Sequence, residues 1–189
     1  MHKKILPGFN IQVRAIVKDS HGKVIKRYPW RRANSLLKNF SLLLYLQMSQ
    51  SATVTITDTG GTPRSCAPNA IVFESYAGAG DTGGGIVIGT GATAVAMTDT
   101  KLVTQVTTNI THSVVLTTSW NPFANTWGVL IVRTFTNATG GNLNIKEVGL
   151  YLQSYAGGNR YICCERSLYN VTVANNASVI FTYGISVSL

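Results

Sequence analysis

The stretch GGGIVIGTGATAVAMTDTKL, residues 83–102, decides between an α/β fold and an all-β fold. Its glycines Gly89 and Gly91 follow a short apolar run and precede small residues in a G-x-G-x-x-A spacing. In a dinucleotide-binding fold this spacing ends a strand and opens a helix whose N-terminus holds the pyrophosphate. Such a fold also needs an acidic residue about 20 positions further on to bind the ribose.

Neither requirement is met after Gly91. The following residues allow one helical turn at most, around 98–102, before Thr- and Val-rich sequence resumes, and residues 101–120 contain no acid. We therefore expect a strand, a tight glycine turn and a single helical turn, with no nucleotide or other cofactor bound. The two glycines then serve an unusual φ or a close approach of neighbouring groups.

The rest of the chain beyond residue 50 consists of short Thr- and Val-rich segments separated by Gly, Asn or Pro. Thr and Val favour strands, and strands at such spacing without helices between them are typical of sandwiches and barrels. We predict an all-β, antiparallel β-sandwich, jelly-roll-like, for residues 51–189. Its strands are expected at 53–57, 70–74, 85–88, 103–110, 113–119, 127–135, 144–152, 161–168 and 178–188.

The first 50 residues predict a hairpin and a helix that form a separate basic docking arm. Residues 9–18 alternate apolar and polar side chains, residues 19–22 suit a turn, and 23–28 return as a second strand that Pro29 ends. A helix is expected from Asn34 or Ser35 to about Gln50. Its candidate subunit-packing side chains are Leu36, Leu37, Phe40, Leu43 and Leu44.

Positive charge is concentrated in this arm. Residues 1–40 hold ten of the sixteen Lys and Arg and one acid, Asp19, whereas residues 41–189 carry six bases and six acids. A basic segment on a neutral body can bind nucleic acid, an anionic membrane or an acidic protein, or it can be a solvated hairpin face. The candidate contacts to DNA or an acidic partner are Lys23, Lys26, Arg27, Arg31 and Arg32.

Catalytic and metal-binding patterns are missing from the sequence. The seven acids are scattered, no G-x-S-x-G elbow occurs, and His112 has no cysteine at metal-ligand spacing. We therefore expect no enzyme activity, no metal and no cofactor. The adjacent Cys163 and Cys164 are expected as buried thiols on opposite faces of a strand. No apolar run approaches the roughly 18 residues that cross a membrane, so no membrane partner is expected.

Three stretches together resemble a known group of proteins. They are IVIGTGATAVAMTDTKL (86–102), RTFTNATGGNLNIKEVGLYLQ (133–153) and CCERSLYNVTVANNASVIFTYGISVSL (163–189). This pattern of strands and turns is similar to that of structural proteins of tailed-bacteriophage virions, a group that includes tail, neck and minor virion proteins. The resemblance implies a small sandwich that assembles into rings or other oligomers, and it carries no functional residues.

The charged fraction of 12% is about half of ordinary usage, which also favours extensive subunit contact. The resulting hypothesis is a homo-oligomeric connector, collar, tail or capsid-associated protein of a phage virion, assembled in the host cytoplasm beside portal, capsid or tail components. The alternative is a carbohydrate- or receptor-binding fibre-type β module. In that case the aromatic platform would use Trp120, Phe123, Trp127 and Tyr155, although core aromatics are the plainer interpretation.

Overall fold

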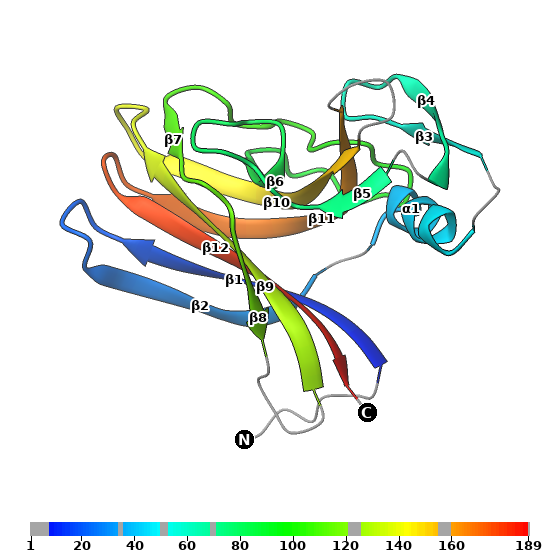
Figure 1. The fold of residues 1–189 in the computed structure, drawn as a ribbon. Coiled ribbons are helices and arrows are strands. Elements are labelled where there is room, and N and C mark those ends of the chain that lie inside the picture. Colours follow the sequence, from blue (N-terminus) through cyan, green and yellow to red (C-terminus); the bar gives the residue numbers. More distant parts are fainter. Residues whose placement is uncertain are drawn as a thin grey trace.

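The protein is a two-layered β-sandwich with one helix. The computed structural model describes residues 8–33, 36–49, 53–68, 71–120, 126–154 and 160–188. Two antiparallel sheets face each other, and the helix and a small two-stranded sheet lie at one side (Figure 1). The predicted all-β antiparallel sandwich with an N-terminal hairpin and one helix is therefore confirmed.

The larger sheet has six strands, in the order β2-β1-β12-β9-β7, with β8 also paired to β9. All its pairings are antiparallel, and the C-terminal strand lies at its centre, between β1 and β9. Its strands are β1 (Gly8–Lys18), β2 (Val24–Arg32), β7 (Ile110–His112), β8 (Leu116–Trp120), β9 (Thr126–Asn137) and β12 (Ser178–Ser188). Strands β1, β9 and β12 extend beyond the second sheet (Figure 1).

The second sheet has the order β11-β10-β5, with β6 also paired to β10. Apolar side chains of the two sheets meet in one core, to which alternate residues of β1, β9, β10, β11 and β12 contribute, as the period of two requires. The strands are β5 (Ile71–Glu74), β6 (Gly85–Gly89), β10 (Leu143–Ser154) and β11 (Arg160–Val173), and the small sheet pairs β3 (Val54–Thr57) with β4 (Pro63–Cys66).

Both faces of β11 are buried over residues 162–167. Cys164 belongs to the core between the sheets, whereas Cys163 packs with Tyr151 and Leu102 beneath the 90–106 segment. The described cysteines are free thiols, as expected, and the adjacent pair lies on opposite faces. Burial raises the pKa of both thiols, so the protonated form is favoured.

The N-terminal hairpin is part of the main sheet. Strand β1 pairs along its whole length with β12, from Gly8 with Ser188 to Lys18 with Ser178. The expected division at residue 50 therefore does not coincide with a boundary between sheets, because backbone hydrogen bonds join the arm to the sandwich. Strand β2 also continues through Pro29 to Arg32. It is an edge strand, where the missing proline N–H costs no ladder hydrogen bond.

Three further local expectations were wrong. Residues 103–109 form no strand; Gln105 makes only an isolated antiparallel bridge with Gly89, through the Thr90 N–H to the Thr104 carbonyl and the Val106 N–H to the Ile88 carbonyl. Residues 98–102 form no helical turn. Helix α1 (Lys38–Met48) starts later than predicted, with Leu37 as its N-cap, and residues 34–35 lie outside the described residues.

Candidate interaction surfaces

The pairing of β1 with β2 divides the predicted basic cluster between two faces. Here the inner face of the six-stranded sheet is the one turned toward the second sheet, and the outer face is the opposite one. Arg27 and Arg32 oppose Ile16 and Gln12, which alternate with buried core residues and therefore lie on the outer face. Lys26 and Arg31 oppose Val17 and Val13, which belong to the core. Lys23 is exposed at the end of the turn.

The inner-face cations pack on aromatic rings at the edge of the sandwich. The Arg31 guanidinium lies 3.5 Å from the ring centre of Tyr169, on β11 of the second sheet. The Lys26 ammonium lies 4.7 Å from the ring centre of Tyr28. Such cation–π contacts are worth about 0.5–1 kcal/mol at exposed sites. The Arg31–Tyr169 contact therefore helps to close the sandwich edge, whereas Lys26 and Tyr28 both belong to β2.

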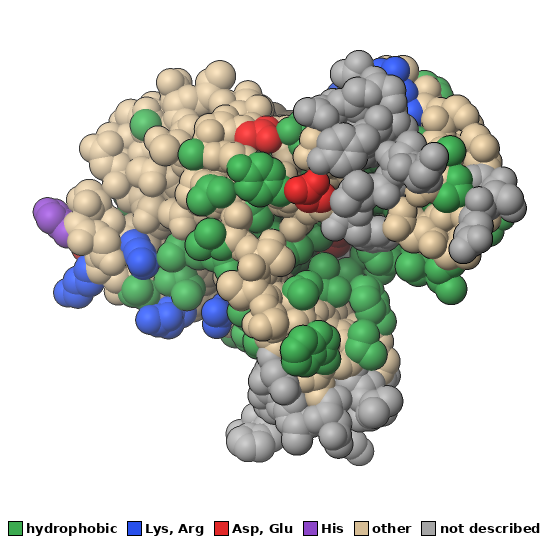
Figure 2. Space-filling model, in the orientation of Figure 1, with side chains coloured by type: hydrophobic (Ala, Val, Ile, Leu, Met, Phe, Trp, Pro, Cys, Tyr) green, Lys and Arg blue, Asp and Glu red, His purple; other side chains and the backbone are tan. Residues whose placement is uncertain are grey.

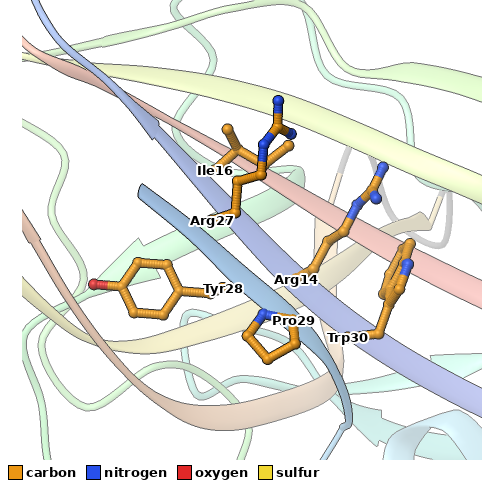
Figure 3. Close-up of a pocket in the computed structure, with 6 residues that line it drawn as sticks. All are labelled: Arg14, Ile16, Arg27, Tyr28, Pro29 and Trp30. Atoms are coloured by element: carbon orange, nitrogen blue, oxygen red, sulfur yellow. The ribbon is translucent and has the colours of Figure 1, made fainter. Parts of the chain in front are cut away.

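The outer face contains a shallow cavity of about 290 Å³ (Figure 3). The Arg14 and Arg27 side chains extend from neighbouring strands toward the same side, and Trp30 stands next to Arg14. The Arg14 guanidinium lies 4.5 Å from the Trp30 ring centre. The other lining residues are Ile16, Tyr28 and Pro29. Sequence reasoning missed Arg14 as a site residue, although the alternation of β1 placed it on the polar face.

Two tryptophans stack across this outer face. The rings of Trp30 and Trp120 are 5.4 Å apart with an interplanar angle of 26°. A Cβ on Gly184 would lie 2.6 Å from the Trp120 ring, so the indole fits here only because residue 184 has no side chain. Trp120 opposes Gly128, and Trp127 therefore lies on the inner face. Of the predicted sugar platform, the described members Trp120 and Trp127 thus lie on opposite faces, and residues 123 and 155 lie outside the described residues.

Helix α1 uses only part of its predicted packing face. Leu37 and Leu43 are buried and Leu36 and Phe40 are half-buried, whereas Leu44 is 45% exposed. The buried face contacts β11 and β3 of the same chain. Leu46 is fully buried but was not predicted, because apolar residues occur on most sides of the helix and the sequence does not show which side is buried. The helix side chains left exposed are Leu44, Tyr45 and Met48.

The projecting end of the six-stranded sheet carries exposed apolar side chains on its inner face. Phe9, Val187 and Trp127 lie side by side on β1, β12 and β9, because Phe9 is paired with Val187 and Val187 with Trp127. Their exposed fractions are 49%, 54% and 67%. We call these three residues the apolar row. Phe9 also stacks on Phe40 of α1 at 6.1 Å, and Figure 2 shows hydrophobic side chains gathered on these projecting strands.

The glycine stretch of 83–102 surrounds a buried ion pair. Arg166 Nε donates to Glu147 at 2.8 Å, and both side chains are fully buried. A Cβ on Gly89 or Gly91 would lie 2.5 Å from Glu147 Oε1, and neither glycine has a positive φ. The glycines therefore serve a close approach to a carboxylate, which was one of the two expected reasons.

The ion pair organises the loop after Gly89. Arg166 also bonds Asp99 at 2.7 Å and the Thr93 carbonyl at 2.8 Å. Burial disfavours its charged form, but the hydrogen bonds to Glu147 and Asp99 outweigh burial and raise the pKa of Arg166. Sequence spacing did not reveal this cluster, because its members come from a loop and two strands.

A second buried acid lies between the sheets. Glu165 accepts hydrogen bonds from the hydroxyl groups of Ser167 and Tyr183 and is fully buried. Burial raises its pKa to about 8.

His112 of β7 is buried against Phe135 of β9. Burial, and to a lesser degree the positive charge of Arg133, lower the pKa of His112 to about 4. Both groups are thus held largely neutral near pH 7.

Within the described residues, no group of three His, Cys, Asp or Glu side chains could hold a metal ion, and no helix is long and apolar enough to cross a membrane. Comparison of the chain with protein-family models, with curated proteins and with solved structures finds no match.

Proposed function

We propose that this protein is a structural subunit that assembles with copies of itself, as a connector, collar, tail or capsid-associated component of a tailed-phage virion. The observation that carries the proposal is the apolar row. Three large side chains on adjacent strands, each about half exposed or more, form a contiguous apolar surface. Surfaces of this kind mark protein–protein contacts in soluble proteins.

The occupant that suits the row is a second copy of the chain. Leu44, Tyr45 and Met48 of α1 add exposed apolar side chains that a neighbouring subunit can cover. The charged fraction of the chain is 12%, and interface cores are depleted in charged residues. Portal, capsid or tail proteins of the same particle are the further partners, and the assembly takes place in the host cytoplasm before the subunit joins the virion.

The test is the oligomeric state of the purified protein. Sedimentation velocity and negative-stain imaging are expected to show rings or other closed oligomers for the wild type. The double variant Trp127→Lys/Val187→Lys places two charges in the apolar row and is expected to shift the protein to monomer. Far-UV circular dichroism checks that this variant is folded.

The matched control is Ile25→Lys/Met97→Lys. These side chains are 57% and 61% exposed and lie outside the apolar row, so their replacement adds the same charge elsewhere. The control is expected to assemble like the wild type. A wild-type monomer at all accessible concentrations, or assembly unchanged in the row variant, contradicts the proposal.

A further inference from the structure

Four cations form a line along the outer face of the hairpin. Outward-facing residues of β1 recur every second position, and each forms a rung with the residue opposite on β2. Along the hairpin, Arg32 of β2 lies opposite Gln12, and Arg14 of β1 follows beside Trp30 at the bulge. Arg27 of β2 then lies opposite Ile16, and Lys18 of β1 comes last. Two residues of strand rise separate the rungs by about 7 Å, so the line spans about 20 Å. We call Arg32, Arg14, Arg27 and Lys18 the cation ladder.

No carboxylate side chain interrupts this surface within the sheet. The six strands of the larger sheet contain no Asp or Glu, and their outer face is otherwise made of apolar, Ser, Thr, Asn, Gln and Gly positions. The acid nearest in sequence, Asp19, accepts hydrogen bonds from the backbone N–H groups of His21 and Lys23 in the turn. Figure 2 shows Lys and Arg side chains gathered toward the β1–β2 turn, away from the exposed acids. The ladder therefore carries an uncompensated positive charge.

Arg14 is held in place at the centre of the ladder. Its guanidinium packs on the Trp30 ring, whose other neighbour is the Trp120 ring. Arg14 Nε is buried and has no hydrogen-bond partner among the described residues. The open cavity beside it is lined by Arg14, Arg27 and Trp30. A planar guanidinium fixed by stacking loses little freedom when it binds an oxyanion, and it matches phosphate oxygens bidentately.

We propose that the cation ladder binds the phosphate backbone of a nucleic acid strand. Four cations along about 20 Å of the hairpin suit a ligand with a row of single negative charges, which is the property of a phosphodiester chain. The proposed contacts are to phosphate oxygens, so we expect binding that is largely independent of nucleotide sequence. Three of the four cations are arginines, and the Trp30 ring lies beside them; this combination favours nucleic acid over an acidic protein surface. This inference does not depend on the assembly proposed above.

The experiment measures fluorescence anisotropy of labelled oligonucleotides of about 20 nucleotides, single-stranded and duplex, between about 50 and 200 mM salt. Four phosphate contacts predict a slope of log K against log salt of about −3 for a single strand and nearly −4 for a duplex. The triple variant Arg14→Gln/Arg27→Gln/Arg32→Gln leaves Lys18 alone. It is expected to lower the affinity about tenfold or more and to bring the slope to about −1.

The matched control is Lys38→Gln/Lys101→Gln/Lys146→Gln. It removes the same net charge from exposed positions outside the ladder and is expected to keep the wild-type slope. Thermal unfolding verifies that both triple variants are folded. Absence of salt-dependent binding by the wild type overturns the proposal and leaves the ladder as protection of an edge strand. Equal losses in both triple variants, or equally tight binding of polyglutamate through the same arginines, overturn it as well.

Discussion

Glu147 is expected to be one of the most sensitive positions of the fold. Its carboxylate accepts the N–H groups of Gly91 at 3.1 Å and Thr104 at 2.8 Å on Oε1, and those of Val103 at 3.1 Å and Arg166 at 2.8 Å on Oε2. In a Glu147→Gln variant one oxygen becomes an NH₂ group, which donates and cannot accept. Two of the four donors then face another donor at a fully buried side chain.

The cost follows from burial. Breaking a fully buried ion pair by removing one partner costs about 3–5 kcal/mol, because the remaining charge stays buried. In Glu147→Gln, Arg166 keeps its ion pair with Asp99, whose side chain is 22% exposed. We therefore expect a loss of stability in the lower half of that range. The double variant Glu147→Met/Arg166→Met leaves neither charge buried. It should lose less stability than the sum of the single changes, by about 2 kcal/mol or more.

Urea unfolding followed by tryptophan fluorescence measures these free energies, and hydrogen exchange of the 90–104 amides reports the loop directly. Exchange in this loop should accelerate in Glu147→Gln, whereas exchange in β12 follows only the global loss of stability. The control Lys146→Gln changes the neighbouring, exposed side chain and should stay within about 0.5 kcal/mol of the wild type. A cost for Glu147→Gln below about 1 kcal/mol, or strict additivity in the double variant, refutes this reasoning.

Three other outcomes are expected. Gly91→Ala should cost about 2 kcal/mol in urea unfolding, because its Cβ would meet Glu147, whereas Gly141→Ala, with open space around it, should be near neutral. Arg133→Met should cost about 3 kcal/mol or more by thermal unfolding, because all five guanidinium N–H groups bond backbone carbonyls between 78 and 113; equal stability contradicts this. Stability should fall by about 1.4 kcal/mol per pH unit between about pH 6.5 and 8, because folded Glu165 keeps a proton that unfolded Glu165 has lost. Below pH 6.5 the opposite linkage of His112 offsets this slope, and Glu165→Gln should abolish the fall; a slope that persists in this variant assigns it to another group.

The basic cluster illustrates how far sequence reasoning reached toward the candidate site. Composition alone located the positive charge in the first 40 residues, because charge counting needs no geometry. The division into Arg27 and Arg32 on one face and Lys26 and Arg31 on the other depends on the pairing of β1 with β2. That pairing contains two register shifts, near Arg14 and near Lys18. Compared with strict alternation, a bulge moves every later side chain of the strand to the opposite face, and the local sequence does not show where a bulge occurs.

The helix shows the same limit in a different way. Its leucines predicted an apolar helix, but Leu44 faces outward and Leu46 inward. A sequence with apolar residues on most sides of a helix has no preferred face of its own, so the contacts with β11 and β3 decide its rotation.

The sequence by itself determined the strand class and most strand positions, because alternation of side chains and turn residues act within a few positions of the chain. It also determined that the glycines at 89 and 91 precede no helix, which excluded the α/β fold. Only the tertiary structure decided that β12 lies between β1 and β9, and that Glu147 and Arg166 meet beneath those glycines. Both depend on contacts between residues distant along the chain. Such contacts form because backbone groups and buried charges must find partners, and no local pattern specifies which partners those are.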